Sequence, residues 1–215
     1  MEILTREIVS TNWLTIVIIS CMVLLAAAKE VNALRLSDFL MLLTNSKYII
    51  AYQKLNKLSS LFNVILILFQ VISVSLFIYL CFGVFECQET DRIILYFKIL
   101  TIYTVVVICK LLIEKIIAAI FSIDSIIDTY LFYKVSYRNF IGVLLLPINI
   151  IYIYSAQLSQ IVCVIIIILL VMLNGIMLFS YYRKNENIIL NNMFYFILYL
   201  SALEIAPYFI LYKLI

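Results

Sequence analysis

Six apolar segments, separated by polar stretches, dominate the pattern of hydrophobic and polar residues along this chain of 215 residues. A helix needs about 20 consecutive apolar residues to cross the hydrocarbon core of a bilayer, and each segment approaches or exceeds that length. Only 3 Gly and 2 Pro occur, so long uninterrupted helices are expected. The pattern predicts an all-α, polytopic helical membrane protein that forms a single integral membrane domain over residues 1–215. It has about six transmembrane helices, near 13–28, 61–82, 93–112, 140–154, 161–182 and 193–215.

Two of the connections are too long to be simple turns. Residues 35–57 place apolar residues such as Phe39 among lysines, and residues 113–135 place apolar residues against Glu114 and Asp128. We predict that each forms an amphipathic interfacial helix, with its apolar side toward lipid and its lysines toward the headgroups. A docking surface for a partner protein is the alternative.

The overall composition supports the membrane class. Hydrophobic residues make up 67% of the chain, charged residues make up 13%, and the mean hydropathy is +1.18. A soluble domain is about 45–50% apolar and about 25% charged. The net charge of +3 does not indicate a nucleic-acid partner, because the basic residues lie mostly in loops between the apolar segments.

Basic residues collect in alternate connections. Residues 29–60 hold five Lys or Arg, the next connection holds only Arg92, and basic residues return in 110–139 and 183–192. The positive-inside rule assigns the basic side to the cytoplasm. We therefore expect both termini on the opposite side of the membrane.

The first apolar segment could be mistaken for a signal peptide, because Ala26, Ala27 and Ala28 resemble a cleavage site. The residues before it include Glu2 and Glu7, whereas a signal peptide has a positively charged start. We therefore expect a retained helix.

Candidate catalytic and metal-binding chemistry is sparse in the sequence. The chain has no His, so neither a zinc site nor haem ligation by histidine is expected, and the commonest general base is missing. Its 5 Cys are an odd number and mostly lie in apolar segments, where a cysteine usually serves as a small hydrophobic residue. We expect no cofactor, no metal and no enzymatic activity.

Glu204 is an ionisable residue inside the last apolar segment. Such a group costs about 2.5–3.5 kcal/mol on insertion scales, so it usually faces a partner, a cavity or an ion path. Pro207 cannot donate to the carbonyl of Leu203, which leaves an acceptor beside the carboxylate. Gln70 and Asn174 lie at comparable depth in two other segments. The sequence therefore predicts a buried polar cluster of Glu204, Gln70, Asn174 and Pro207.

Two interpretations of this cluster stay open. Its members could form interhelical hydrogen bonds that hold the bundle together, each worth about 0.6 kcal/mol on average. Alternatively, the carboxylate could bind a proton or a cation in a transporter-like protein. Separately, the spacing of Lys110 and Glu114 favours a pair on one helix face.

Several short motifs carry a resemblance to a known family. They are Arg-Glu-Ile-Val-Ser at 6–10 with Trp13 after it, Ser-Leu-Phe-Ile-Tyr-Leu at 75–80, Leu-Leu-Pro at 145–147, and Leu-Tyr-x-x-x-Leu-Glu-Ile-x-Pro at 198–207. Together they resemble a family of uncharacterised multi-pass inner-membrane proteins of Bacteroidota, filed as a domain of unknown function. The resemblance covers nearly the whole chain and implies a location in the bacterial inner membrane with both termini periplasmic. It implies no activity.

Three functions are compatible with these features. The first is a non-enzymatic scaffold or accessory subunit of a larger envelope complex. The second is a small transporter or channel that uses Glu204. The third is a lipid-modifying enzyme with Asp124 and Asp128 at the cytoplasmic interface. The expected partners are the lipid bilayer and other membrane or envelope proteins, and no nucleic acid.

Overall fold

The computed structural model describes residues 12–42, 47–52, 60–84, 92–120, 124–154 and 160–184. Almost all of these residues are helical, and none of them lies in a strand. They form seven helices: α1 (Asn12–Val31), α2 (Ala33–Leu40), α3 (Lys47–Tyr52), α4 (Leu61–Val84), α5 (Arg92–Ile120), α6 (Asp124–Tyr154) and α7 (Gln160–Lys184).

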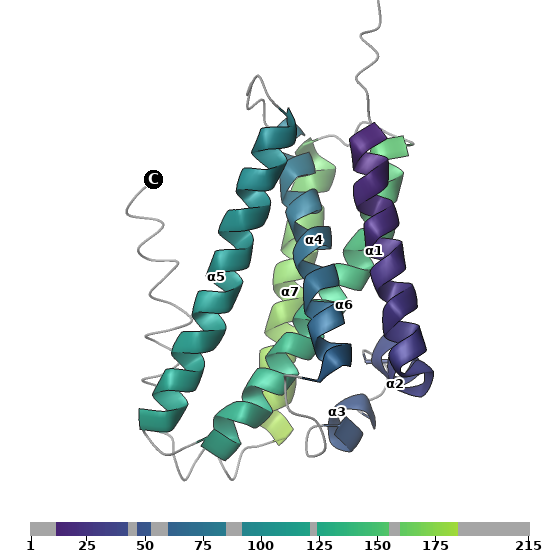
Figure 1. Cartoon of the computed structure of the whole chain (residues 1–215). Coiled ribbons are helices and arrows are strands. Elements are labelled where there is room, and N and C mark those ends of the chain that lie inside the picture. The colour runs from purple at the N-terminus through teal and green to yellow at the C-terminus, as the bar shows by residue number, and fades with distance from the viewer. Residues whose placement is uncertain are drawn as a thin grey trace, which may run out of the picture.

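The five long helices form a bundle in which successive helices run in opposite directions (Figure 1). α4 lies at its centre and contacts α1, α5 and α6, while α7 packs against α6. The two short helices, α2 and α3, lie at the end of the bundle where α1 and α5 finish and where α4 and α6 begin (Figure 1). We call this the α2–α3 end.

Four helices in the described ranges are long and apolar enough to cross a membrane: Asn12–Val31, Leu61–Gly83, Arg92–Ile120 and Ile127–Tyr154. α7 follows them, with a shorter apolar part at Gln160–Ile176. These helices cover the first five predicted spans. The sixth, at 193–215, lies outside the described residues.

Residues 113–135 do not form a separate interfacial helix. α5 continues to Ile120 and α6 begins at Asp124, so the two spanning helices take up most of this region. The charges here suggested a membrane boundary, but Glu114 and Lys134 pair inside the bundle, which allows both helices to continue past them.

Residues 35–57 contain two short helices, and their apolar side chains pack on the bundle. Phe39 and Tyr48 are buried. The ring of Tyr48 stacks on Phe132 of α6 with 5.8 Å between centroids, and Phe39 meets Phe140 of α6 edge-on at 6.0 Å. The apolar side of these helices therefore faces protein, whereas the amphipathic pattern had predicted contact with lipid.

Arg35 ties α2 to the start of α4. Its backbone N–H donates to Oδ1 of Asn32 at 2.9 Å, and Asn32 is the N-cap residue of α2. Its buried guanidinium donates to Oδ1 of Asn63 at 2.9 Å and to Oγ of Ser60 at 3.3 Å. The same group lies 4.5 Å from the ring centre of Phe62, within the range of a cation–π contact. The buried guanidinium of Arg35 is tolerated here because two side-chain oxygens and an aromatic ring interact with its positive charge.

Candidate functional site

The residues predicted as a polar cluster have different surroundings. Gln70 is fully buried in α4, and its Nε2 donates to the hydroxyl of Tyr103 in α5. Asn174 is exposed on α7, and its Nδ2 donates to the carbonyl of Leu170 in the same helix at 2.9 Å. Glu204 and Pro207 lie outside the described residues, so their contact with either side chain stays a prediction.

A buried ion pair joins α5 to α6. Lys134 of α6 donates from Nζ to Oε1 of Glu114 in α5. Glu114 is fully buried and Lys134 is 8% exposed. The second oxygen, Oε2, is also buried and has no hydrogen-bond partner within the described part of the chain. A carboxylate in apolar surroundings is costly unless it is paired, so Lys134 is what makes Glu114 tolerable at this position.

Arg138 lies one helical turn beyond Lys134 on α6. It interacts electrostatically with Glu114 and with Tyr103, the residue that also binds Gln70. We call this group of five residues the charged cluster: Gln70, Tyr103, Glu114, Lys134 and Arg138. Among the residues that the structure describes, it contains one carboxylate and two cationic groups.

Helical periodicity explains why these residues meet. Residues four apart share one face of a helix, as Tyr130, Lys134 and Arg138 do on α6. Nζ of Lys134 lies 5.4 Å from the ring centre of Tyr130 on that face. On α5, Tyr103 and Glu114 lie about three turns apart and belong to the same side as the buried Val107.

A second group of polar contacts joins α4 to α6 at close range. A Cβ on Gly142 of α6 would lie 2.9 Å from Cα of Gln70, so the two backbones meet where no side chain fits. Oγ of Ser73 donates to the carbonyl of Gly142 at 2.9 Å, and Nδ2 of Asn149 donates to the carbonyl of Ser73 at 3.0 Å. This arrangement is typical of membrane helices, where small residues allow close packing and polar side chains bond across it.

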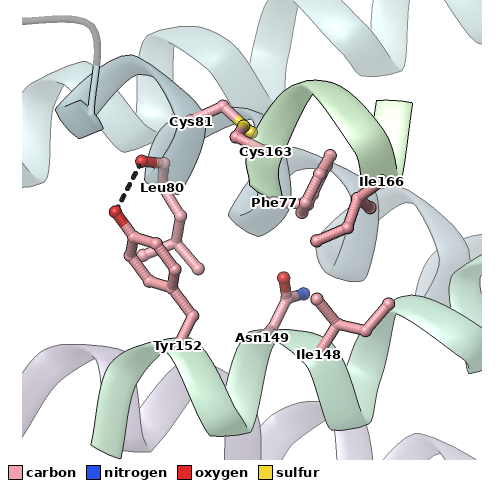
Figure 2. A pocket seen from close by; sticks show the side chains of 8 residues that line it. All are labelled: Phe77, Leu80, Cys81, Ile148, Asn149, Tyr152, Cys163 and Ile166. Atoms are coloured by element: carbon pink, nitrogen blue, oxygen red, sulfur yellow. Dashed lines mark hydrogen bonds between the residues drawn. The ribbon is translucent and has the colours of Figure 1, made fainter. Parts of the chain in front are cut away.

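A small open pocket lies between α4, α6 and α7 (Figure 2). Most of its lining is apolar, and Tyr152 closes one side by donating to the carbonyl of Leu80 at 3.2 Å. Cys81 and Cys163 lie at another side with their sulfur atoms adjacent (Figure 2). Asn149 provides a polar group, but its Nδ2 already binds Ser73. The pocket offers little chemistry for catalysis.

The carboxylate pair considered for a lipid-modifying enzyme belongs to the start of α6. Asp124 is the first residue of this helix, and Asp128 is exposed about one turn later. A carboxylate near a helix N-terminus is stabilised by the helix dipole, and this applies to Asp128. In the described ranges no group of three or more Cys, Asp, Glu or His is placed to hold a metal ion.

Comparison with known proteins adds a family but no activity. Residues 14–215 match the family described as Domain of unknown function (DUF4271). The chain belongs to this family. Neither the curated proteins nor the solved structures contain a match to it. The DUF4271 match spans the membrane helices described above, and it agrees with the predicted resemblance to a domain of unknown function.

Sequence reasoning missed the charged cluster of this DUF4271 chain. The sequence predicts that the third span ends at 112 and the fourth begins at 140, so Glu114 and Lys134 fall in the predicted interfacial helix at 113–135, and Arg138 falls just after it. The spacing of four between Tyr130, Lys134 and Arg138 was the available signal. It indicates a helical face, although it does not identify what that face meets.

Proposed function

We propose that the chain is a non-enzymatic protein of the bacterial inner membrane, with both termini periplasmic, that serves as a scaffold or accessory subunit of a larger envelope complex. The family match supports a membrane protein of unknown function and leaves its role open.

The observation that supports a structural role most directly is that interior polar side chains bond one helix to another. Gln70 joins α4 to α5 through Tyr103, and Lys134 joins α6 to α5 through Glu114. Ser73 joins α4 to α6. A bundle held in this way presents fixed outer faces, and those of α5 and α7 carry many exposed apolar residues suited to lipid or to partner helices.

Purification in mild detergent from the native membrane tests the proposal. We expect other membrane or envelope proteins to remain bound at a fixed ratio through two successive affinity steps. A matched control with an unrelated six-helix protein, tagged and expressed at the same level, should not retain them. A monodisperse preparation of this chain alone, unchanged after crosslinking in intact cells, would contradict a role as a subunit.

The distribution of charge supports the proposed orientation. Lys29, Arg35 and Lys115 belong to the α2–α3 end, whereas Arg92 begins α5 at the other end (Figure 1). Both positions can be labelled in a variant without native cysteines. Lys115→Cys should react with a membrane-impermeant thiol reagent only after the inner membrane is permeabilised. Arg92→Cys should react in cells whose outer membrane alone is permeabilised. The reverse pattern would contradict this orientation.

A transporter or channel is the second candidate, and it is favoured by the burial of Glu114, whose Oε2 has no hydrogen-bond partner among the described residues. An intramembrane carboxylate is a frequent element of proton and cation paths. The two cationic groups beside Glu114, Lys134 and Arg138, oppose a cation ligand. In proteoliposomes, a transporter should move protons or cations, and Glu114→Gln or Glu204→Gln should abolish this flux while the protein stays folded. Equal leak with and without the protein would exclude this candidate.

A further inference from the structure

Arg138 has one edge of its guanidinium buried inside the bundle without a hydrogen-bond partner among the described residues. The buried donors without a hydrogen-bond partner, among the residues that the structure describes, are Nε and Nη2. These two atoms share one edge of the planar group, and their N–H bonds point the same way. Such an edge matches two oxygens of one carboxylate or phosphate through two parallel hydrogen bonds. Two buried donors without an acceptor are costly, so an acceptor is expected here.

The neighbouring carboxylate does not fill this edge. Oε1 of Glu114 binds Lys134, and Oε2 has no hydrogen-bond partner among the described residues, so neither oxygen is bonded to Arg138. The hydroxyl of Tyr103 interacts with Arg138 electrostatically, but it accepts no hydrogen bond from Nε or Nη2. The planar edge of a guanidinium is matched best by carboxylate or phosphate oxygens, so an anion is the acceptor expected here.

The depth of Arg138 brings it within reach of the headgroup region. From Arg138 to its end at Tyr154, α6 rises about 24 Å, which places Arg138 about one turn inside a hydrocarbon core of about 30 Å. The side chain is half-buried, and a long arginine at this depth can extend toward the interface. Tyr137, Tyr133 and Tyr130 follow Arg138 along the about 12 Å of α6 that lead toward the α2–α3 end, as aromatic residues do near a membrane surface.

We propose that the Nε–Nη2 edge of Arg138 binds a phosphate group between α5 and α6, at the α2–α3 end of the bundle. The headgroup of an anionic phospholipid and free inorganic phosphate carry the same chemistry. Basic sites between transmembrane helices are known to take such headgroups. The site goes beyond the proposed scaffold function, which requires no ligand.

Lipid binding to the purified full-length chain tests the proposal. The protein, stripped of lipid in detergent, would receive phosphatidylglycerol, diacylglycerol with the same acyl chains, or inorganic phosphate at constant ionic strength. Native mass spectrometry measures bound lipid, and the unfolding midpoint measures stabilisation by either ligand. We expect one phosphatidylglycerol to bind and to raise the midpoint, while diacylglycerol, which lacks the phosphate, does neither. An equal shift with inorganic phosphate would support the site and identify free phosphate as a sufficient ligand.

Variants assign the binding to the edge of Arg138. Arg138→Gln should weaken phosphatidylglycerol binding about tenfold or more, since it removes charge-assisted hydrogen bonds. Arg138→Lys keeps the charge without the planar edge and should also bind more weakly than wild type. Arg92→Gln changes an exposed arginine at the opposite end and should bind like wild type.

Three results would overturn the proposal. The first is binding of neither phosphate source to the wild-type chain. The second is equal binding by wild type and Arg138→Lys, which remains informative if Arg138→Gln does not fold. The third is a stability loss shared by Arg138→Gln and Glu204→Gln, with no further loss in the double variant. That last result would show that a carboxylate of the chain itself occupies the edge.

Discussion

Single residues decide how closely the helices of this bundle approach. Gly142 lies where α6 meets the backbone of α4, and a Cβ there would come within 2.9 Å of Cα of Gln70. Real Cβ atoms essentially never come this close to another heavy atom, so any larger residue must push the helices apart. The hydrogen bond from Ser73 to the carbonyl of Gly142 would be lengthened at the same time.

Gly142→Ala should therefore destabilise the folded bundle by about 1–3 kcal/mol, the usual cost of overpacking. Gly175→Ala is the matched control, since that position on α7 has nothing within 4 Å, and alanine there should be neutral or stabilise by about 1 kcal/mol. Unfolding of both variants in mixed micelles measures the difference. A neutral Gly142→Ala would mean that α4 and α6 do not meet at this point.

Tyr48 in α3 predicts a dependence on alkaline pH. Burial raises the pKa of Tyr48 above the ordinary tyrosine value, and the nearby Arg35 guanidinium only partly opposes this rise. The folded state therefore keeps a proton that the unfolded state loses, so stability is full below about pH 10 and falls as pH increases beyond it. Tyr48→Phe should lose this part of the pH dependence in unfolding experiments. An unchanged alkaline slope would indicate that the Tyr48 hydroxyl is in water.

At the scale of helices, the sequence predicts membrane helices well where the apolar run is unbroken. The predicted span at 61–82 nearly coincides with α4 (Leu61–Val84). The prediction fails at the α5–α6 connection, because charged residues were taken as membrane boundaries. Glu114 and Lys134 compensate each other across two helices, and such a pairing cannot be read from either segment alone. The amphipathic pattern of residues 35–57 likewise does not say whether its apolar side faces lipid or protein.

The position of α7 against α4 can be tested through two native thiols. The sulfur atoms of Cys81 in α4 and Cys163 in α7 are adjacent, and the two side chains interact (Figure 2). Copper phenanthroline with oxygen as the electron acceptor should join them into a disulfide in the native membrane, detectable by peptide mapping. Cys81→Ser should abolish that linked peptide and leave Cys21 unmodified, since Cys21 is buried in α1. A different cysteine pairing would show that α7 packs elsewhere.

For the whole molecule, the central claim is that the interior charges hold the helices together. The fold class could be predicted from composition and periodicity. The charged cluster could not, because Glu114, Lys134 and Arg138 lie outside the predicted spans and meet only when α5 packs against α6. The predicted role of Glu204 is untouched by this result, since that residue lies outside the described ranges.

The pair of Glu114 and Lys134 allows the most direct test of this claim, through a double-mutant cycle on the free energy of unfolding. Glu114→Gln removes the buried carboxylate that pairs with Lys134 and should cost about 3–5 kcal/mol. Lys134→Met should cost less, because Arg138 still faces the carboxylate. The double variant should lose clearly less than the sum of the two single losses, and it should keep the bound partners of wild type. Additive losses, or a stable Glu114→Gln protein that has lost ion flux, would contradict a structural role for the cluster.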